Sequence, residues 1–217
     1  MGLSLIGKKI GMTQYFNADG VVFPVTVVQA GPCTVVKKKT IESDGYNAVQ
    51  LGYGNLEVRK LNKPMKGYFK GYNAEPTSSL KEFRDFDLSK INAGQEILVT
   101  SFTEGDFVDV TGVSIGKGYQ GVVKRHGFAG GPKTHGSNFH RRPGSIGMCE
   151  HPAETPKGRK MAGHMGAKKI TTLNLKIIKI LEDKNLLLVK GAVPGHKNGI
   201  VYIRESVKKN GSEKRNV

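Results

Sequence analysis

Residues 116–121 read Gly-Lys-Gly-Tyr-Gln-Gly, the Gly-x-Gly-x-x-Gly spacing with which backbone amides approach a dinucleotide pyrophosphate. A dinucleotide site needs a strand before the motif, a helix after it and an acidic residue about twenty positions further on. A strand is expected over 106–115, but another strand rather than a helix is expected over 119–124, and Arg141 and Arg142 stand where the acid should be. The glycines therefore predict close approach of the backbone to an anion, and no nucleotide cofactor is expected.

A second group of reactive side chains consists of four histidines and one cysteine: His135, His140, Cys149, His151 and His164. Their spacing matches neither a His-Glu-x-x-His helix nor a Cys/His finger, and the surrounding cations would repel Zn²⁺. The serine in residues 144–147, Gly-Ser-Ile-Gly, is one residue short of a nucleophile elbow, and no carboxylate pair stands out. We therefore expect no metal, no cofactor, no small-molecule substrate and no enzymatic activity.

The two cysteines, Cys33 and Cys149, lie far apart with no second cysteine near either. This spacing excludes a Cys-x-x-Cys redox motif and favours reduced intracellular thiols over a disulfide. No apolar run approaches the length of about 18 residues that a membrane span requires, and no signal peptide is evident. A cytoplasmic protein without a membrane partner is expected.

The charge of the chain is strongly positive and unevenly distributed. The formal net charge is +16 and the isoelectric point is near 9.8, which points to a polyanionic partner. Residues 117–169 hold eleven Lys or Arg against two acids and five of the six histidines, while only fourteen of these 53 residues are apolar. So few apolar residues cannot form a core, whereas spaced cations can follow a phosphate backbone and place Phe128 or Phe139 against bases.

The candidate RNA contacts are the basic and imidazole side chains of this segment, together with two lysines near the start of the chain. They are Lys8, Lys9, Lys117, Lys124, Arg125, His126, Lys133, His135, His140, Arg141, Arg142, Lys157, Arg159, Lys160, His164 and Lys168.

The remaining sequence predicts the elements that would position these side chains. Short β-branched runs separated by Gly, Asn and Asp favour an antiparallel barrel over a parallel sheet. Further strands are expected over 21–28, 33–36, 47–53, 171–181, 186–190 and 199–204, and short helices over 64–70 and 88–93. The predicted fold is mainly β, an antiparallel β-barrel with a small mixed insertion and a long extended basic loop.

The expected division assigns 1–58, 96–126 and 167–208 to the barrel, 59–95 to the insertion, 127–166 to the loop and 209–217 to a tail.

Eight strings in one order span nearly the whole chain: 7–13 (GKKIGMT), 105–112 (GDFVDVTG), 116–121 (GKGYQG), 124–128 (KRHGF), 135–137 (HGS), 142–147 (RPGSIG), 157–166 (KGRKMAGHMG) and 189–195 (VKGAVPG). By these strings the chain resembles the bacterial branch of the large-subunit ribosomal protein L-three family. The resemblance implies a barrel of the translation-protein type on the large subunit. Its implied partners are the 3′ portion of the large-subunit rRNA and neighbouring large-subunit proteins, with an early role in assembly.

The resemblance also implies a long loop that runs towards the peptidyl-transferase centre, with residues 144–156 as its distal part. The tip residues it implies are Gly144, Ser145, Ile146, Gly147, Met148, Cys149 and Glu150. Many bacterial members have a glutamine, sometimes methylated, at the position of Met148, so that modification is not expected in this chain.

Three hypotheses were weighed: a structural rRNA-binding protein, a nucleotide-dependent enzyme and a free nucleic-acid-binding regulator. The missing acid and the missing helix argue against the enzyme. A free regulator more often concentrates its contacts on a folded face, whereas a basic loop without a core needs a partner that surrounds it. The sequence therefore favours the structural rRNA-binding protein.

Overall fold

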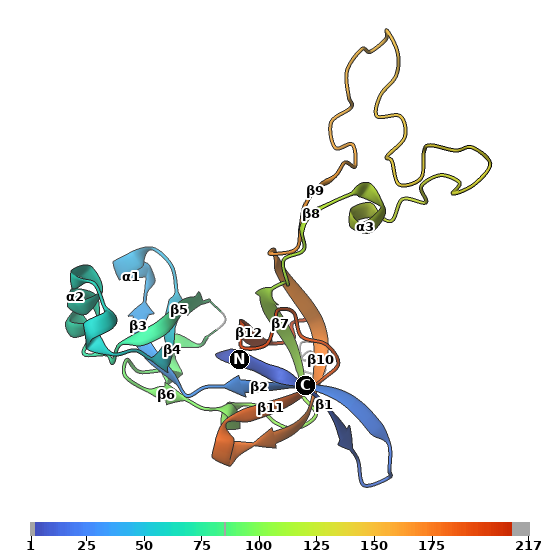
Figure 1. Ribbon diagram of the computed structural model, residues 1–217. Coiled ribbons are helices and arrows are strands. Elements are labelled where there is room, and N and C mark those ends of the chain that lie inside the picture. The colour runs from blue at the N-terminus through green and yellow to red at the C-terminus, as the bar shows by residue number, and fades with distance from the viewer. Residues whose placement is uncertain (1–2, 85, 210–217) are drawn as a thin grey trace. The chain divides into compact units, whose positions relative to one another are not determined.

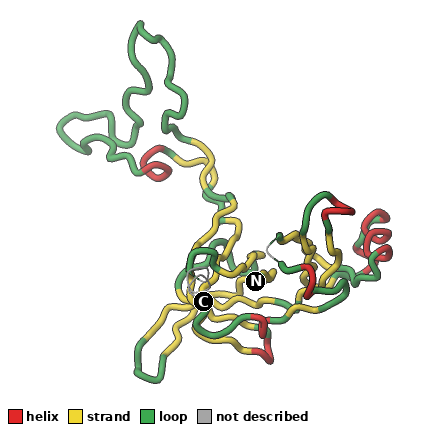
Figure 2. The backbone as a smooth tube through the Cα atoms, turned by 180° about the vertical axis from the view of Figure 1, so that it is seen from behind, coloured by secondary structure: helices red, strands yellow, loops and turns green. Residues whose placement is uncertain are grey.

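The computed structural model describes residues 3–84 and 86–209, so that most of the expected tail, 210–217, lies outside the described residues. The chain divides into two compact units. Residues up to 113 together with those from 169 on form one, here called the barrel unit, and Ser114–Lys168 form the other, here called the basic unit. Figures 1 and 2 show both units.

The barrel unit is built around a closed antiparallel barrel with the strand order β1-β12-β7-β10-β11-β2 (Figure 1). Its strands are β1 (Ser4–Phe16), β2 (Val22–Ala30), β7 (Phe107–Val113), β10 (Lys169–Leu181), β11 (Leu186–Lys190) and β12 (Ile200–Glu205). The expected fold class, mainly β with an antiparallel barrel, is confirmed.

The barrel closes because apolar side chains from its strands share one core. Leu5, Val28, Ile177 and Ile203 are fully buried there. Gly7 allows β1 to lie close against β2, since a Cβ at this position would come within 2.8 Å of the Gln29 carbonyl oxygen. Strands β1 and β2 pair along nearly their whole length, with a bulge in β1.

A second, four-stranded sheet with the order β5-β4-β3-β6 belongs to the same unit. Its strands are β3 (Cys33–Lys39), β4 (Ala48–Asn55), β5 (Thr77–Phe83) and β6 (Glu96–Ile97). The helical elements of this unit are α1 (Ile41–Asp44), η1 (Val58–Lys60), α2 (Lys63–Gly71), η2 (Leu88–Lys90), η3 (Val99–Ser101) and η4 (Glu182–Lys184). None of the helices in the described part of the chain is long and apolar enough to cross a membrane.

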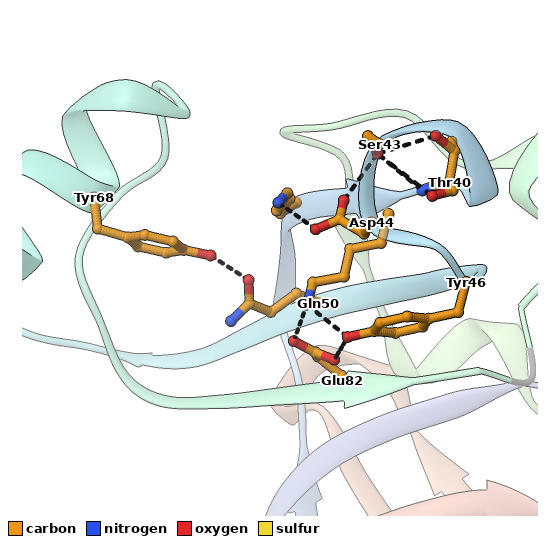
Figure 3. Close-up of polar contacts among 9 residues, drawn as sticks. Thr40, Ser43, Asp44, Tyr46, Gln50, Tyr68 and Glu82 are labelled. Atoms are coloured by element: carbon orange, nitrogen blue, oxygen red, sulfur yellow. Dashed lines mark hydrogen bonds and ion pairs between the residues drawn. The ribbon is translucent and has the colours of Figure 1, made fainter.

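A network of charged side chains and hydroxyls links β3 to β5 across β4, and β3 to α1 (Figure 3). The Lys39 ammonium lies 2.7 Å from a Glu82 carboxylate oxygen, and Tyr46 donates a hydrogen bond of 2.9 Å to the same carboxylate. Lys37 pairs with Asp44 at 2.9 Å. The hydrogen bonds from the two lysines lower the pKa of Glu82 and of Asp44 below their ordinary values.

The expected strand over 119–124 is wrong beyond its second residue. Strand β8 (Gly118–Gln120) ends there, and a helix, α3 (Val122–His126), follows the glycine motif, so the expected absence of a helix is also wrong. Gly121 is the N-cap of α3, and Gly127, with a φ of 72°, ends it in the left-handed conformation. Yet α3 has only five residues, and β8 pairs antiparallel with β9 (Gly163–Met165) alone, so no βαβ unit is formed.

Candidate nucleic-acid interface

The frame of the basic unit is the two-stranded ribbon of β8 and β9. Gly118 pairs with Met165 and Gln120 with Gly163 in antiparallel register. The Lys117 amide adds a hydrogen bond of 2.9 Å to the Met165 carbonyl. The ribbon holds the outgoing and returning arms of the loop side by side, and nearly everything between them is loop (Figure 2).

Helix α3 is fastened to the returning arm by two of the expected RNA contacts. Arg125 donates a hydrogen bond of 2.7 Å from Nη1 to the Met161 carbonyl, and His126 Nε2 lies 3.0 Å from the same oxygen. A Cβ on Gly163 would come within 2.6 Å of Arg125 Nη1, so only glycine leaves room for this contact. These two side chains therefore stabilise the unit itself, which sequence reasoning missed.

A turn of the loop is closed where residues 130–131 meet residues 139–140. The Gly131 amide donates a hydrogen bond of 2.7 Å to the His140 carbonyl. A Cβ on Gly131 would come within 2.3 Å of the Phe139 ring, so a larger residue would displace that ring. The turn leaves Lys133, His135, Arg141 and Arg142 exposed around it.

The distal part of the loop has its own short-range contacts. Ser145 donates a hydrogen bond of 2.7 Å from Oγ to the Gly147 carbonyl, and Arg159 donates one to the Ser145 carbonyl. Gly144 is half-buried, while residues 145–150 are exposed. The expected tip is therefore accessible, and Arg159, like Arg125, has a partner within the chain.

The two lysines expected from the start of the chain lie in β1, on the barrel unit. Lys9 donates hydrogen bonds from Nζ to the carbonyls of Val193 at 2.7 Å and Gly195 at 3.0 Å. Lys8 is half-buried. The ammonium of Lys9 therefore anchors a loop between barrel strands.

All eleven of the other expected contacts are exposed to solvent in the basic unit. They are Lys117, Lys124, Lys133, His135, His140, Arg141, Arg142, Lys157, Lys160, His164 and Lys168.

The charged side chains of the basic unit are almost all positive. Ser114–Lys168 carries ten Lys or Arg against Glu150 and Glu154, and no ion pair forms within this segment, all of which the structure describes. Only Val122 is buried there. Cations that have no acidic partner and stand on a backbone without a core create a strong positive field, which suits a polyphosphate partner.

Metal binding finds no support in the geometry. The residues described in the structure contain no group of three or more His, Cys, Asp or Glu side chains that could hold a metal ion. Both cysteines are free, Cys33 buried and Cys149 exposed. Burial raises the pKa of the Cys33 thiol to about 11.

Comparisons with known proteins agree with this geometry. The profile of the family described as ribosomal protein L3 matches residues 77–185. The protein named large ribosomal subunit protein uL3 of Carboxydothermus hydrogenoformans is 50% identical over 208 residues, which cover 96% of this chain and 99% of that protein. The chain belongs to the ribosomal protein L3 family.

Membership of the L3 family confirms the resemblance given by the eight sequence strings. As an L3 protein, the chain is a structural component of the large ribosomal subunit rather than an enzyme, and its location is the cytoplasmic ribosome. In the structure, the glycine motif at 116–121 contains strand β8 and ends at Gly121, the N-cap of α3.

Proposed function

We propose that this L3 protein binds large-subunit rRNA directly, through the exposed cations of its basic unit, and that it joins the subunit early in assembly. The observation that carries the proposal is the charge of Ser114–Lys168, which holds ten Lys or Arg and only two acidic residues. The name of the relative from Carboxydothermus hydrogenoformans, a large ribosomal subunit protein, supports the choice of subunit.

The physical argument rests on what such a segment lacks. A chain of 55 residues with one buried side chain gains little from folding by itself, so its geometry has to be supported by a partner. Cations spaced along an extended backbone can each neutralise a phosphate and release counterions. RNA that surrounds the segment on several sides meets both requirements.

The two units are assigned different contacts on the ribosomal subunit. We infer that the barrel unit is seated on the subunit and touches neighbouring ribosomal proteins and the 3′ portion of the rRNA. The basic unit then runs towards the peptidyl-transferase centre, with residues 144–150 nearest to it. The exposure of 145–150 supports this assignment, because a segment free of the protein's own packing can contact RNA. Methylation of a glutamine plays no part, since Met148 occupies that position.

The decisive test combines sedimentation with salt titration. The full chain should co-sediment with large subunits after a high-salt wash. On an rRNA fragment from the 3′ portion, log K should fall steeply with log salt, by about 0.9 per neutralised phosphate in duplex regions and about 0.7 in single strands. A slope near zero would contradict direct rRNA binding through these cations.

The tip assignment has a separate test. Substitutions confined to Ser145–Glu150 should leave incorporation into subunits intact and change the rate of peptide-bond formation or the sensitivity to drugs that act at the catalytic centre. The measurement is a translation assay with purified variant ribosomes. Variants that match the parent in both readouts would place the tip away from that centre.

A further inference from the structure

The barrel unit contains a hollow of about 300 Å³. It lies where β5 and the residue after it meet side chains of β7, β10 and β12. Its lining includes five charged side chains and one tyrosine: Lys81, Glu82, Arg84, Lys169, Arg204 and Tyr202. All of them belong to the barrel unit, so the hollow is independent of the loop.

The hollow carries four cations and one carboxylate, and the carboxylate is engaged elsewhere. Glu82 accepts hydrogen bonds from Lys39 and Tyr46 of the neighbouring network (Figure 3). Lys81 lies over the ring of Tyr202, 5.5 Å from its centroid, and Arg84 lies over the ring of Tyr46 at 4.6 Å. An aromatic face attracts a cation but does not cancel its charge, so the hollow remains positive.

Arg204, which lines the hollow, has hydrogen-bond donors that are not fully used within the described part of the chain. Its Nη2 lies 3.6 Å from Asp109 Oδ2, an ion pair longer than a hydrogen bond. Within the described residues, its buried Nε has no hydrogen-bond partner. The side chain is 41% exposed, so solvent and ligands can reach part of the guanidinium. A guanidinium has five N–H donors, and an unsatisfied buried donor is unusual enough to need an explanation.

We infer that this hollow binds one phosphodiester of the RNA backbone, which would supply a specific site for the rRNA contact of the barrel unit. The inference rests on the proposed function. Arginine presents a planar fork that matches phosphate oxygens, and lysine adds a point charge, so Arg204, Arg84 and Lys169 together suit a phosphate. The volume also has room for the attached ribose, beside the ring of Tyr202.

An acidic side chain of a protein neighbour is the competing occupant, and the geometry favours RNA over it. One carboxylate carries one charge, and four cations around a single hollow exceed what it can satisfy. A phosphodiester continues into further phosphates on both sides, so that cations at the rim, such as Arg84 and Lys169, can each meet one.

The test compares three charge-removing double variants and one charge-conserving double variant of the full chain in binding to the same rRNA fragment over a range of salt. R84Q/K169Q removes two charges from the hollow, and K66Q/K70Q removes two from exposed positions of α2 in the same unit. R141Q/R142Q removes two from the basic unit and tests the proposed function. Arg204 is left intact because it pairs with buried Asp109.

R84Q/K169Q should lower the magnitude of the salt slope by about 1 to 2 and weaken binding, while K66Q/K70Q should match the parent. R84K/K169R keeps both charges and should restore the slope, which separates lost charge from lost folding. Failure of that restoration would overturn the inference.

The remaining outcomes separate the two proposals. If R141Q/R142Q weakens binding and R84Q/K169Q behaves like K66Q/K70Q, the phosphate hollow is wrong and the proposed function stands. If neither R141Q/R142Q nor R84Q/K169Q changes the slope, direct rRNA binding itself is wrong. If R84Q/K169Q binds RNA normally but loses a neighbouring subunit protein on sedimentation, the occupant is an acidic protein and the inference is overturned.

Discussion

The barrel unit and the basic unit solve the problem of holding a backbone in place by different means. The barrel unit surrounds fully buried side chains such as Leu5, Ile177 and Ile203. The basic unit has one buried residue, Val122, and relies on glycine turns and on side chains that reach backbone carbonyls. The buried core and the densest run of cations therefore lie in separate parts of the sequence.

Among these tests of the difference between the two units, removal of the loop should have the largest effect, and the quantity it changes is rRNA binding. Deleting 128–166 and closing the gap with a short glycine linker removes six Lys or Arg. The magnitude of the salt slope on rRNA should fall by up to about 5, since each cation accounts for at most about 0.9. Some affinity should remain from the cations of the barrel unit.

The same deletion should barely change the fold of the barrel unit, because no residue of the deleted segment lies in its core cluster. A stability change below about 1 kcal/mol corresponds to a shift of less than about 4 °C in the thermal midpoint of a chain of this size. Thermal melting is the measurement. A deletion protein that does not fold would show that the two units depend on each other.

A matched pair of isoleucines tests the difference in packing. Ile203→Ala removes a fully buried side chain from the barrel and should lower the free energy of unfolding by about 2–5 kcal/mol. Ile146→Ala changes a side chain that is 45% exposed in the loop and should stay within about 0.5 kcal/mol of the parent. Urea denaturation gives both values, and equal losses would contradict the contrast between the units.

The two cysteine thiols should differ in reactivity, because one lies in the barrel unit and the other in the basic unit. Burial raises the pKa of Cys33 from its ordinary value of 9.0 to about 11, so its thiolate fraction at neutral pH falls about a hundredfold. Cys149 is exposed on the loop. A thiol reagent should modify one cysteine rapidly in native protein and the second only under denaturing conditions. Peptide mapping should identify the fast site as Cys149, and rapid modification of Cys33 would contradict its burial.

The smallest expected effect is a loss of folding stability at acid pH. The lowered pKa values of Asp44 and Glu82 mean that their ion pairs stabilise the folded state above the unfolded pKa values, 3.8 and 4.5. That stabilisation is lost as the pH falls below about 4.5 and through the lowered pKa values of the folded state. Solvent screens both partly exposed pairs, so the loss should be modest.

Glu82→Gln should reduce the acid-dependent part of the loss, as measured by urea unfolding at pH 7, 4 and 3. A variant with the same pH dependence as the parent would show that the pair with Lys39 contributes nothing measurable.

Much of the barrel was predictable because its strands are rich in β-branched residues, as in β2, β10 and β12. Strand β1 is not among the expected strands, since Gly7, Lys8 and Lys9 interrupt its apolar pattern. Strand β5 was missed as well, because it is largely polar and is held by its pairing with β4. Such strands depend on neighbours that are distant in sequence.

The candidate site was predictable in its charge and not in its internal contacts. A local excess of Lys and Arg is visible in any sequence window. Nothing in the sequence links Arg125 to the carbonyl of Met161, which lies 36 positions further on. Helix α3 escaped prediction for a related reason, since five residues between two glycines show no helical periodicity.

The place of β12 between β1 and β7 has a consequence for the order of synthesis. Strand β1 is made first and cannot complete its pairing in the barrel until Ile200–Glu205 has emerged from the ribosome that is making the chain. The four-stranded sheet, by contrast, has all of its strands once residue 97 has emerged. Ser114–Lys168 also emerges before β12, so the cationic segment is complete and outside the ribosome while the barrel is still open.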